Sequence, residues 1–205
     1  MTVLARTDMG GRTENRPHVL GIGGTPRPGS SSEVALRAQL VAAERYGATT
    51  EAITAVDLDF PMYDPDAAPL TPAAERLLAA VRRADAVVIS SPGYHGGVSG
   101  LLKNALDYFQ ELAGDTTPYL DGRAVGCVVA AAGWQAATTT LGSLRMTVHA
   151  LRGWPTPLGV AFNSMTKPFD PEGQVIDLKL AGQFDTMAEQ MVSFAAGHRR
   201  AIASV

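Results

Sequence analysis

Residues 19–33 read VLGIGGTPRPGSSSE, a short apolar run followed by a loop rich in glycine and serine and by the start of a helical pattern. Glycines let a backbone approach an anion closely, and three consecutive serines offer hydroxyl and amide donors. Arg27 adds a fixed positive charge, and a helix beginning at Glu33 points its positive end at the same place. The stretch therefore predicts a strand, a loop that holds a phosphate group, and a helix.

This loop matches neither of the two common nucleotide-binding patterns. Gly24 and Gly29 have the glycine spacing of a nucleoside triphosphate loop, but Ser30 stands where that loop has lysine. Gly21 and Gly23 begin the dinucleotide pattern, but Pro26 stands where the third glycine belongs. A ligand with a single phosphate therefore fits this loop better than a nucleoside triphosphate or a dinucleotide does. The plain alternative is a turn followed by a serine-capped helix.

After Pro17 the chain alternates apolar runs of strand length with segments of helical period, five times over. This pattern predicts an α/β fold of three layers, a doubly wound sheet of five parallel strands with helices on both faces. The expected strands are residues 19–22, 49–56, 86–90, 124–130 and 158–162. The expected helices are residues 33–46 with Val34, Ala38 and Val41 on one face, one starting at Thr71 and Pro72, residues 100–109, one containing Leu141, Leu144, Val148 and Leu151, and a last one lined by Phe184, Met187, Met191 and Phe194.

Length and composition favour one domain, residues 17–205, preceded by a flexible polar tail over residues 1–16. The net charge of −3 and the absence of a long lysine and arginine run argue against a nucleic-acid partner. No apolar run has the length of a membrane span or the pattern of a secretion signal. Cys127 is the single cysteine, which fits a reducing, cytoplasmic setting.

Four acidic residues follow the second expected strand, at Asp57, Asp59, Asp64 and Asp66. Their spacing lacks the glycine and the terminal glutamate of a calcium loop. We therefore expect a solvated acidic loop here, and no metal site in the chain.

A second glycine-rich loop follows the third expected strand, where residues 90–108 read SSPGYHGGVSGLLKNALDY. It opens at the same edge of the sheet as the first loop, because the carboxyl ends of parallel strands share one edge. Backbone amides freed by such a turn can bond the edge of a flat heteroaromatic ring, which can lean against Tyr94 or Pro92.

With both loops in place, residues 19–194 resemble the NAD(P)H-dependent FMN reductases, flavoproteins with a flavodoxin-like fold. The first loop resembles their Gly-Ser-x-Arg-x-x-Ser segment. The second resembles Pro-x-Tyr-x-x-x-x-x-Gly-x-Leu-Lys-Asn-x-x-Asp, and it matches at Pro92, Tyr94, Gly100, Leu102, Lys103, Asn104 and Asp107.

The resemblance implies that the chain binds FMN as cofactor and uses NADPH or NADH as co-substrate. It implies that the phosphate of FMN is bound by Thr25, Arg27, Ser30 and Ser32, with Ser31 as an additional contact. It implies that the isoalloxazine ring and ribityl chain are held by Pro92, Gly93, Tyr94, His95 and Gly96. The chain departs from the family at Thr25, where serine is commoner, and at Gly93, where glutamate is frequent.

Several other residues have two interpretations. Trp134, in the loop after the fourth expected strand, either roofs the site or packs in a dimer contact. His95 is an acid or base, or it serves as a ring contact and positions the backbone, and the second is favoured by its glycine neighbours. Lys103 and Asp107 form an ordinary helix pair or a dimer contact. Cys127 is expected in the core rather than at a redox centre.

The implied activity is that of an oxidoreductase, in which a nicotinamide passes a hydride to the flavin and the electrons reach a flavin, a quinone, an azo compound or a similar small-molecule acceptor. No catalytic acid or base is required. The alternatives are an FMN-binding electron carrier without nicotinamide activity, or a flavoenzyme of secondary metabolism on the same scaffold. The resemblance further implies a homodimer or a dimer of dimers, with a flavin-dependent monooxygenase as a partner of some members.

Overall fold

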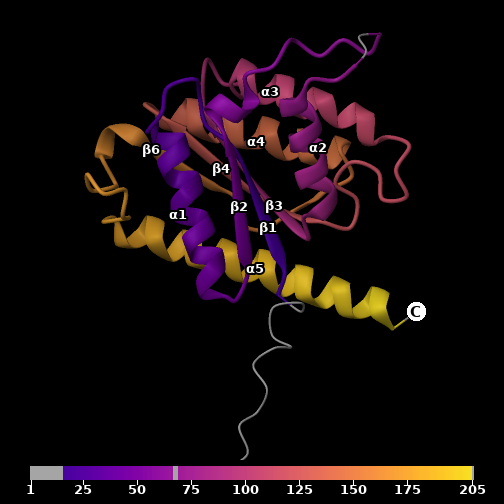
Figure 1. Cartoon of the computed structure of the whole chain (residues 1–205). Coiled ribbons are helices and arrows are strands. Elements are labelled where there is room, and N and C mark those ends of the chain that lie inside the picture. Colours follow the sequence, from indigo (N-terminus) through magenta and orange to yellow (C-terminus); the bar gives the residue numbers. More distant parts are fainter. Residues whose placement is uncertain (1–15, 67–68, 205) are drawn as a thin grey trace, which may run out of the picture.

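The computed structural model describes residues 16–66 and 69–204 and consists of one parallel sheet between two helical layers (Figure 1). The strands are β1 His18–Gly23, β2 Thr49–Thr54, β3 Ala86–Pro92, β4 Ala124–Ala131, β5 Trp154–Pro155 and β6 Val160–Asn163. Their order is β2-β1-β3-β4-β5, and β6 pairs with β4 as well. This is the flavodoxin-like order, so the expected fold class is confirmed.

The fifth strand position is divided between β5 and β6. Both pieces pair with the same edge of β4, first through Trp154 opposite Ala124 and then through Val160 opposite Val128. The sequence predicted only the second piece, because Pro155 and Pro157 make the first piece look like a loop. Proline is tolerated there because this strand lies at the edge of the sheet.

Helices α1 Ser31–Arg45 and α5 Leu178–Ala203 cover one face of the sheet, and α2 Pro72–Arg83, α3 Gly100–Asp107 and α4 Trp134–Ala150 cover the other (Figure 1). Three short 3₁₀ helices complete the chain, namely η1 Ala55–Leu58, η2 Tyr108–Leu112 and η3 Ser164–Thr166. Each face has its own apolar core, one around Leu77, Phe109 and Leu144 and one around Leu36, Phe184 and Met187.

Local signals placed the helix starts well. Ser30 caps α1 by accepting a hydrogen bond from Glu33 N, and Thr71 caps α2 by accepting one from Ala74 N. The expected face of α1 was wrong, because Val41 is 48% exposed while Leu36, Gln39 and Leu40 are buried. β2 ends at Thr54 rather than residue 56, since Asp57 accepts a hydrogen bond from Thr54 N and the chain turns into η1.

Cys127 lies in β4 and is completely buried. Burial raises the pKa of its thiol to about 12, so the thiolate is scarce at neutral pH and the side chain serves as a small apolar residue. None of the described helices is long and apolar enough to cross a bilayer. Residues 1–15 of the expected tail lie outside the described residues, and Arg16 donates hydrogen bonds to the carbonyls of Gly47 and Ala48.

Candidate functional site

The loop between β1 and α1 presents unpaired donors at the carboxyl edge of the sheet. In the described part of the chain, the backbone amides of Ser30, Ser31 and Ser32 have no acceptor, as is usual in the first turn of a helix. The Ser30 and Ser32 hydroxyl oxygens lie 3.3 Å apart. Ser32 and Thr25 are buried, and Arg27 is exposed with no ion-pair partner among the described residues. These groups form a cradle for an anion.

Glu33 holds the loop in shape, a role that the sequence analysis missed. Its Oε2 accepts a hydrogen bond from Gly29 N at 3.0 Å, and its Oε1 accepts hydrogen bonds from the Arg37 guanidinium, the closer at 2.8 Å. Arg37 thereby neutralises a buried carboxylate that would otherwise repel an anion in the loop. A glutamate at the third helical position is a known cap signal, but its bond to Gly29 depends on the folded loop.

The loop after β3 closes as a tight hairpin. Tyr94 and Gly97 exchange two backbone hydrogen bonds of 3.0 Å, and both central residues have positive φ, 54° at His95 and 83° at Gly96. A type I′ turn requires positive φ at these two positions. The amides of His95 and Gly96 have no acceptor among the described residues, so they remain available as donors.

Buried hydroxyl groups fix this second loop to the sheet. Ser91 Oγ accepts a hydrogen bond from Ser99 N at 3.0 Å, and Ser99 in turn caps α3. Gly93 N donates to the Ala130 carbonyl. A Cβ at Gly93 would lie 3.0 Å from Ala131 Cβ and 3.1 Å from Thr140 Oγ1, so a larger residue would require these neighbours to shift.

The two loops meet at one cavity of about 340 Å³, which we call the loop cavity. Eight of the ten predicted site residues line it, namely Thr25, Arg27, Ser30, Ser31, Ser32, Pro92, Gly93 and Tyr94. His95 and Gly96 belong to the same hairpin but do not line it. Gly29, Ala130, Ala131, Ala132 and Ser164 also line it. Ser164 of η3 could not be found from sequence, since it is brought here only by the pairing of β6 with β4.

A cavity of similar volume, about 370 Å³, lies between α1, α5 and residues 171–175. It shares no residue with the loop cavity. Its arginines, Arg37 and Arg45, are paired with Glu33 and Asp185. No cluster of histidine, cysteine and acidic side chains that could hold a metal occurs in residues 16–66 and 69–204.

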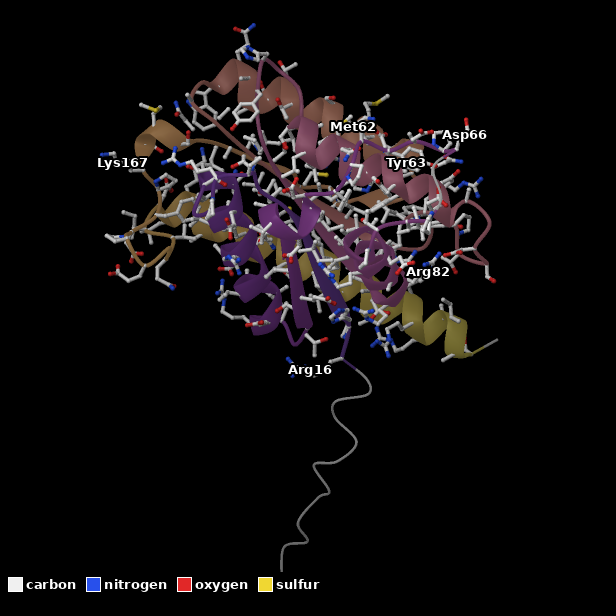
Figure 2. The ribbon with its side chains drawn as sticks, turned by 45° about the horizontal axis from the view of Figure 1, so that its top comes forward. Arg16, Met62, Tyr63, Asp66, Arg82 and Lys167 are labelled. Carbon is white, nitrogen blue, oxygen red and sulfur yellow. The ribbon has the colours of Figure 1, made fainter. Side chains whose placement is uncertain are left out.

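Asn104 of the second motif connects α3 to the segment after η1. Its Oδ1 accepts a hydrogen bond from Tyr63 N at 2.8 Å, and its Nδ2 donates to the Pro61 carbonyl at 2.9 Å. Tyr108 Oη also donates to the Pro61 carbonyl. The Tyr63 phenol donates to Glu111, and this hydrogen bond raises the pKa of Tyr63 to about 12. Tyr63 and Met62 lie on the α3 side of the molecule, away from Lys167 (Figure 2).

The geometry defines a flavodoxin-like protein whose loops after β1 and β3 meet at one cavity and carry backbone amides without acceptors among the described residues. Comparison with known proteins identifies the family: residues 17–167 match the model of NADPH-dependent FMN reductases, and the chain belongs to that family. The chain is an oxidoreductase whose cofactors are FMN and NAD(P)H and whose substrates are small molecules.

Two relatives and one solved structure of the same fold illustrate the similarity. An NAD(P)H-dependent FMN reductase of Pseudomonas aeruginosa is 30% identical over 167 residues, which are 78% of this chain and 85% of the relative. A protein named "Probable NADPH:quinone oxidoreductase 2" of Oryza sativa subsp. japonica is 27% identical over 129 residues, 60% of each chain. The structure of FerB, a flavoenzyme NAD(P)H:(acceptor) oxidoreductase from Paracoccus denitrificans, superimposes with a TM-score of 0.72 at 20% identity, covering 89% of this chain and 98% of that one.

Replacement of Asn104 by alanine should destabilise the fold. The substitution leaves Tyr63 N without its acceptor and removes one of the two side-chain donors to the Pro61 carbonyl, which costs about 1–3 kcal/mol. Urea unfolding followed by circular dichroism measures the difference in the free energy of unfolding between the variant and the wild type. Lys103→Ala, which removes an exposed helix ion pair one residue away, is the control and should change stability by less than about 0.5 kcal/mol. Equal stability of the two variants would contradict the role given to Asn104.

Proposed function

We propose that the loop cavity binds FMN, with the phosphate at the β1–α1 loop. Thr25, Arg27, Ser30, Ser31 and Ser32 would hold the phosphate. The support is the set of three consecutive amides without acceptors, beside an arginine without an ion-pair partner among the described residues.

The same proposal places the isoalloxazine ring and ribityl chain against the β3–α3 loop. Pro92, Gly93, Tyr94, His95 and Gly96 would hold them. The support is that the His95 and Gly96 amides have no acceptor among the described residues and that the Tyr94 ring is 56% exposed. Such amides can bond the polar edge of a flat heteroaromatic ring, while an aromatic side chain packs on its apolar part. Ser164, from η3, faces the same cavity and is a further candidate contact.

Bound FMN supplies hydride and electron transfer between the nicotinamide and the acceptor. The task of the chain is then to bind FMN and to orient the nicotinamide and the acceptor against it. The loop cavity is lined by backbone, hydroxyl groups and small side chains, and its ionisable side chains are Arg27 and Tyr94. This lining requires no acid or base from the protein. We therefore propose that the chain supplies no catalytic acid or base and that His95, with its φ of 54°, serves to position the backbone of the hairpin.

For the acceptor we propose quinones and azo compounds, with free flavin as a third member of the class. All are flat conjugated molecules that can lie against an exposed ring system. The support is the similarity to a protein named as an NADPH:quinone oxidoreductase, together with the 56% exposed ring of Tyr94 in the lining of the loop cavity. We propose a flavin-dependent monooxygenase as a protein partner that receives the electrons. We also propose that the protein is located in the cytoplasm.

Protein purified with FMN should oxidise NADPH or NADH, and adding a quinone or an azo dye should raise the rate several-fold, because the acceptor regenerates the oxidised cofactor. The loss of nicotinamide absorbance measures this. A protein that binds FMN yet oxidises neither nucleotide with any of FMN, quinone or azo dye would refute the proposed reductase and favour an electron carrier.

Replacing Arg27 by alanine should weaken FMN binding about tenfold, which corresponds to about 1.4 kcal/mol, because a charge-assisted contact to the phosphate is lost. Quenching of flavin fluorescence on titration measures the dissociation constant, and riboflavin, which has no phosphate, should bind both proteins equally. The matched control is Arg76→Ala, which removes an exposed arginine on α2. Unchanged FMN affinity in Arg27→Ala would refute the phosphate contact.

We also propose that the protein is a homodimer or a dimer of dimers that uses the outer face of α4. The support is Met146, which is 71% exposed in the C-terminal half of this helix. Light scattering should then give at least twice the mass of one chain, and Met146→Glu should shift the protein toward the monomer, since a charge is costly in an apolar contact. Met165→Glu, at a 70% exposed methionine on η3, should leave the mass unchanged. A monomeric wild-type protein at micromolar concentration would contradict the proposal.

A further inference from the structure

A smaller cavity of about 210 Å³ lies between β6, η3 and the first turns of α5, and we call it the α5 cavity. Sites for complete ligands usually measure roughly 300–1,000 Å³, so a cavity of this size suits one part of a larger ligand. Its lining residues are Trp134, Ala161, Phe162, Asn163, Thr166, Pro168, Asp177, Lys179, Leu180 and Gln183.

The α5 cavity adjoins the loop cavity. Asn163 lines the first and Ser164, the next residue, lines the second, so their Cα atoms are about 3.8 Å apart. Trp134 lines the first and Ala132 the second, at most about 7 Å apart along the chain. One extended ligand can therefore reach both cavities.

Four side chains in the α5 cavity have polar groups without a partner among the described residues. Asn163 Oδ1 accepts a hydrogen bond from Met165 N, which leaves its Nδ2 without an acceptor in the described part of the chain. The Gln183 amide has no partner among the described residues. A carboxamide pair next to the 58% exposed indole of Trp134 suits a flat ring with polar edges, since the indole offers a stacking face.

The third polar group is the ammonium of Lys179, in the first turn of α5. Cations are unfavourable at this end of a helix, and Lys179 has no ion-pair partner in residues 16–66 and 69–204. Asp177, the one carboxylate in the lining, caps the helix by accepting from the amides of Lys179 and Leu180 through Oδ1. Its other oxygen has no donor within residues 16–66 and 69–204 and can accept a hydrogen bond from a hydroxyl group.

These groups match the parts of an adenosine phosphate. Trp134 would stack on the base, Asn163 and Gln183 would bond its edge, and Asp177 would accept from a ribose hydroxyl. Lys179 would bind a phosphate oxygen as a point charge. Resting on the proposed function, we propose that the α5 cavity binds the adenosine phosphate part of NAD(P)H while the nicotinamide reaches the loop cavity.

The test measures binding of ADP-ribose and of its 2′-phosphorylated form to the FMN-loaded protein by calorimetry. Neither probe has a nicotinamide, so binding is measured without turnover. Both Lys179→Ala and Trp134→Ala should weaken the binding of at least one probe about tenfold, and Lys179→Arg and Trp134→Phe should restore most of it. The proposal is overturned if wild-type protein binds neither probe, or if either alanine variant binds both probes like the wild type.

The matched control is Arg200→Ala, which removes one positive charge from the opposite end of α5 and should bind the probes like the wild type. The FMN dissociation constant should be unchanged in all five variants. In steady state, Lys179→Ala should raise KM without lowering kcat. A rise for NADPH alone assigns Lys179 to the 2′-phosphate, and a rise for both nucleotides assigns it to the shared diphosphate.

Failure of this inference and failure of the proposed function give different results. If wild-type protein oxidises NAD(P)H but the Lys179 and Trp134 variants bind both probes normally, the adenosine site is wrong and the reductase stands. If wild-type protein binds FMN but oxidises neither nucleotide, the reductase itself is wrong.

Discussion

The contact between the end of β1 and the neighbouring β3 determines where every part of the site can lie. A Cβ at Gly23 would be 2.1 Å from the Ser90 carbonyl oxygen, and Gly23 has a φ of +155°, so only glycine fits. The close approach lets Gly24 N donate to that same carbonyl. Ser90 Oγ then donates to the Ser32 carbonyl in the first turn of α1, at 2.7 Å. β3 and the helix that presents the anion cradle are therefore joined directly.

This junction lies at the point where the strand order reverses. From β1 the chain crosses to β2 on one side and later to β3 on the other, so the loops after β1 and β3 diverge from neighbouring strands and leave a crevice between them. β4 continues the same direction and brings Ala130, Ala131 and Ala132 to the crevice. The small size of these residues and of Gly93 keeps the crevice open. The position of the crevice therefore follows from the strand order, and the side chains that line it determine its width.

The sequence predicts those features of the fold and the site that are determined by residues close together in the chain. The caps at Ser30 and Thr71 and the grouping of Thr25 to Ser32 with Pro92 to Tyr94 all follow from short motifs plus the rule that parallel strands share one carboxyl edge. The sequence analysis missed the features that are determined by contacts between residues far apart in the chain. The split edge strand depends on pairing with β4, and Ser164 reaches the loop cavity only through that pairing. The buried face of α1 was misjudged because Gln39 is buried by donating to the Phe184 carbonyl on α5, a partner 145 residues away.

The two sides of the site differ in what can vary without loss of the fold. On the cradle side, Thr25 and Glu33 are buried and accept hydrogen bonds from backbone amides of the loop, so their exchange disturbs the loop as well as any ligand. On the open side, Tyr94 and Trp134 are more than half exposed, and neither side chain supports the core. These two exposed aromatic residues can therefore be exchanged with the least disturbance of the fold. A common cofactor site combined with different acceptors is the expected result for a family built on this scaffold.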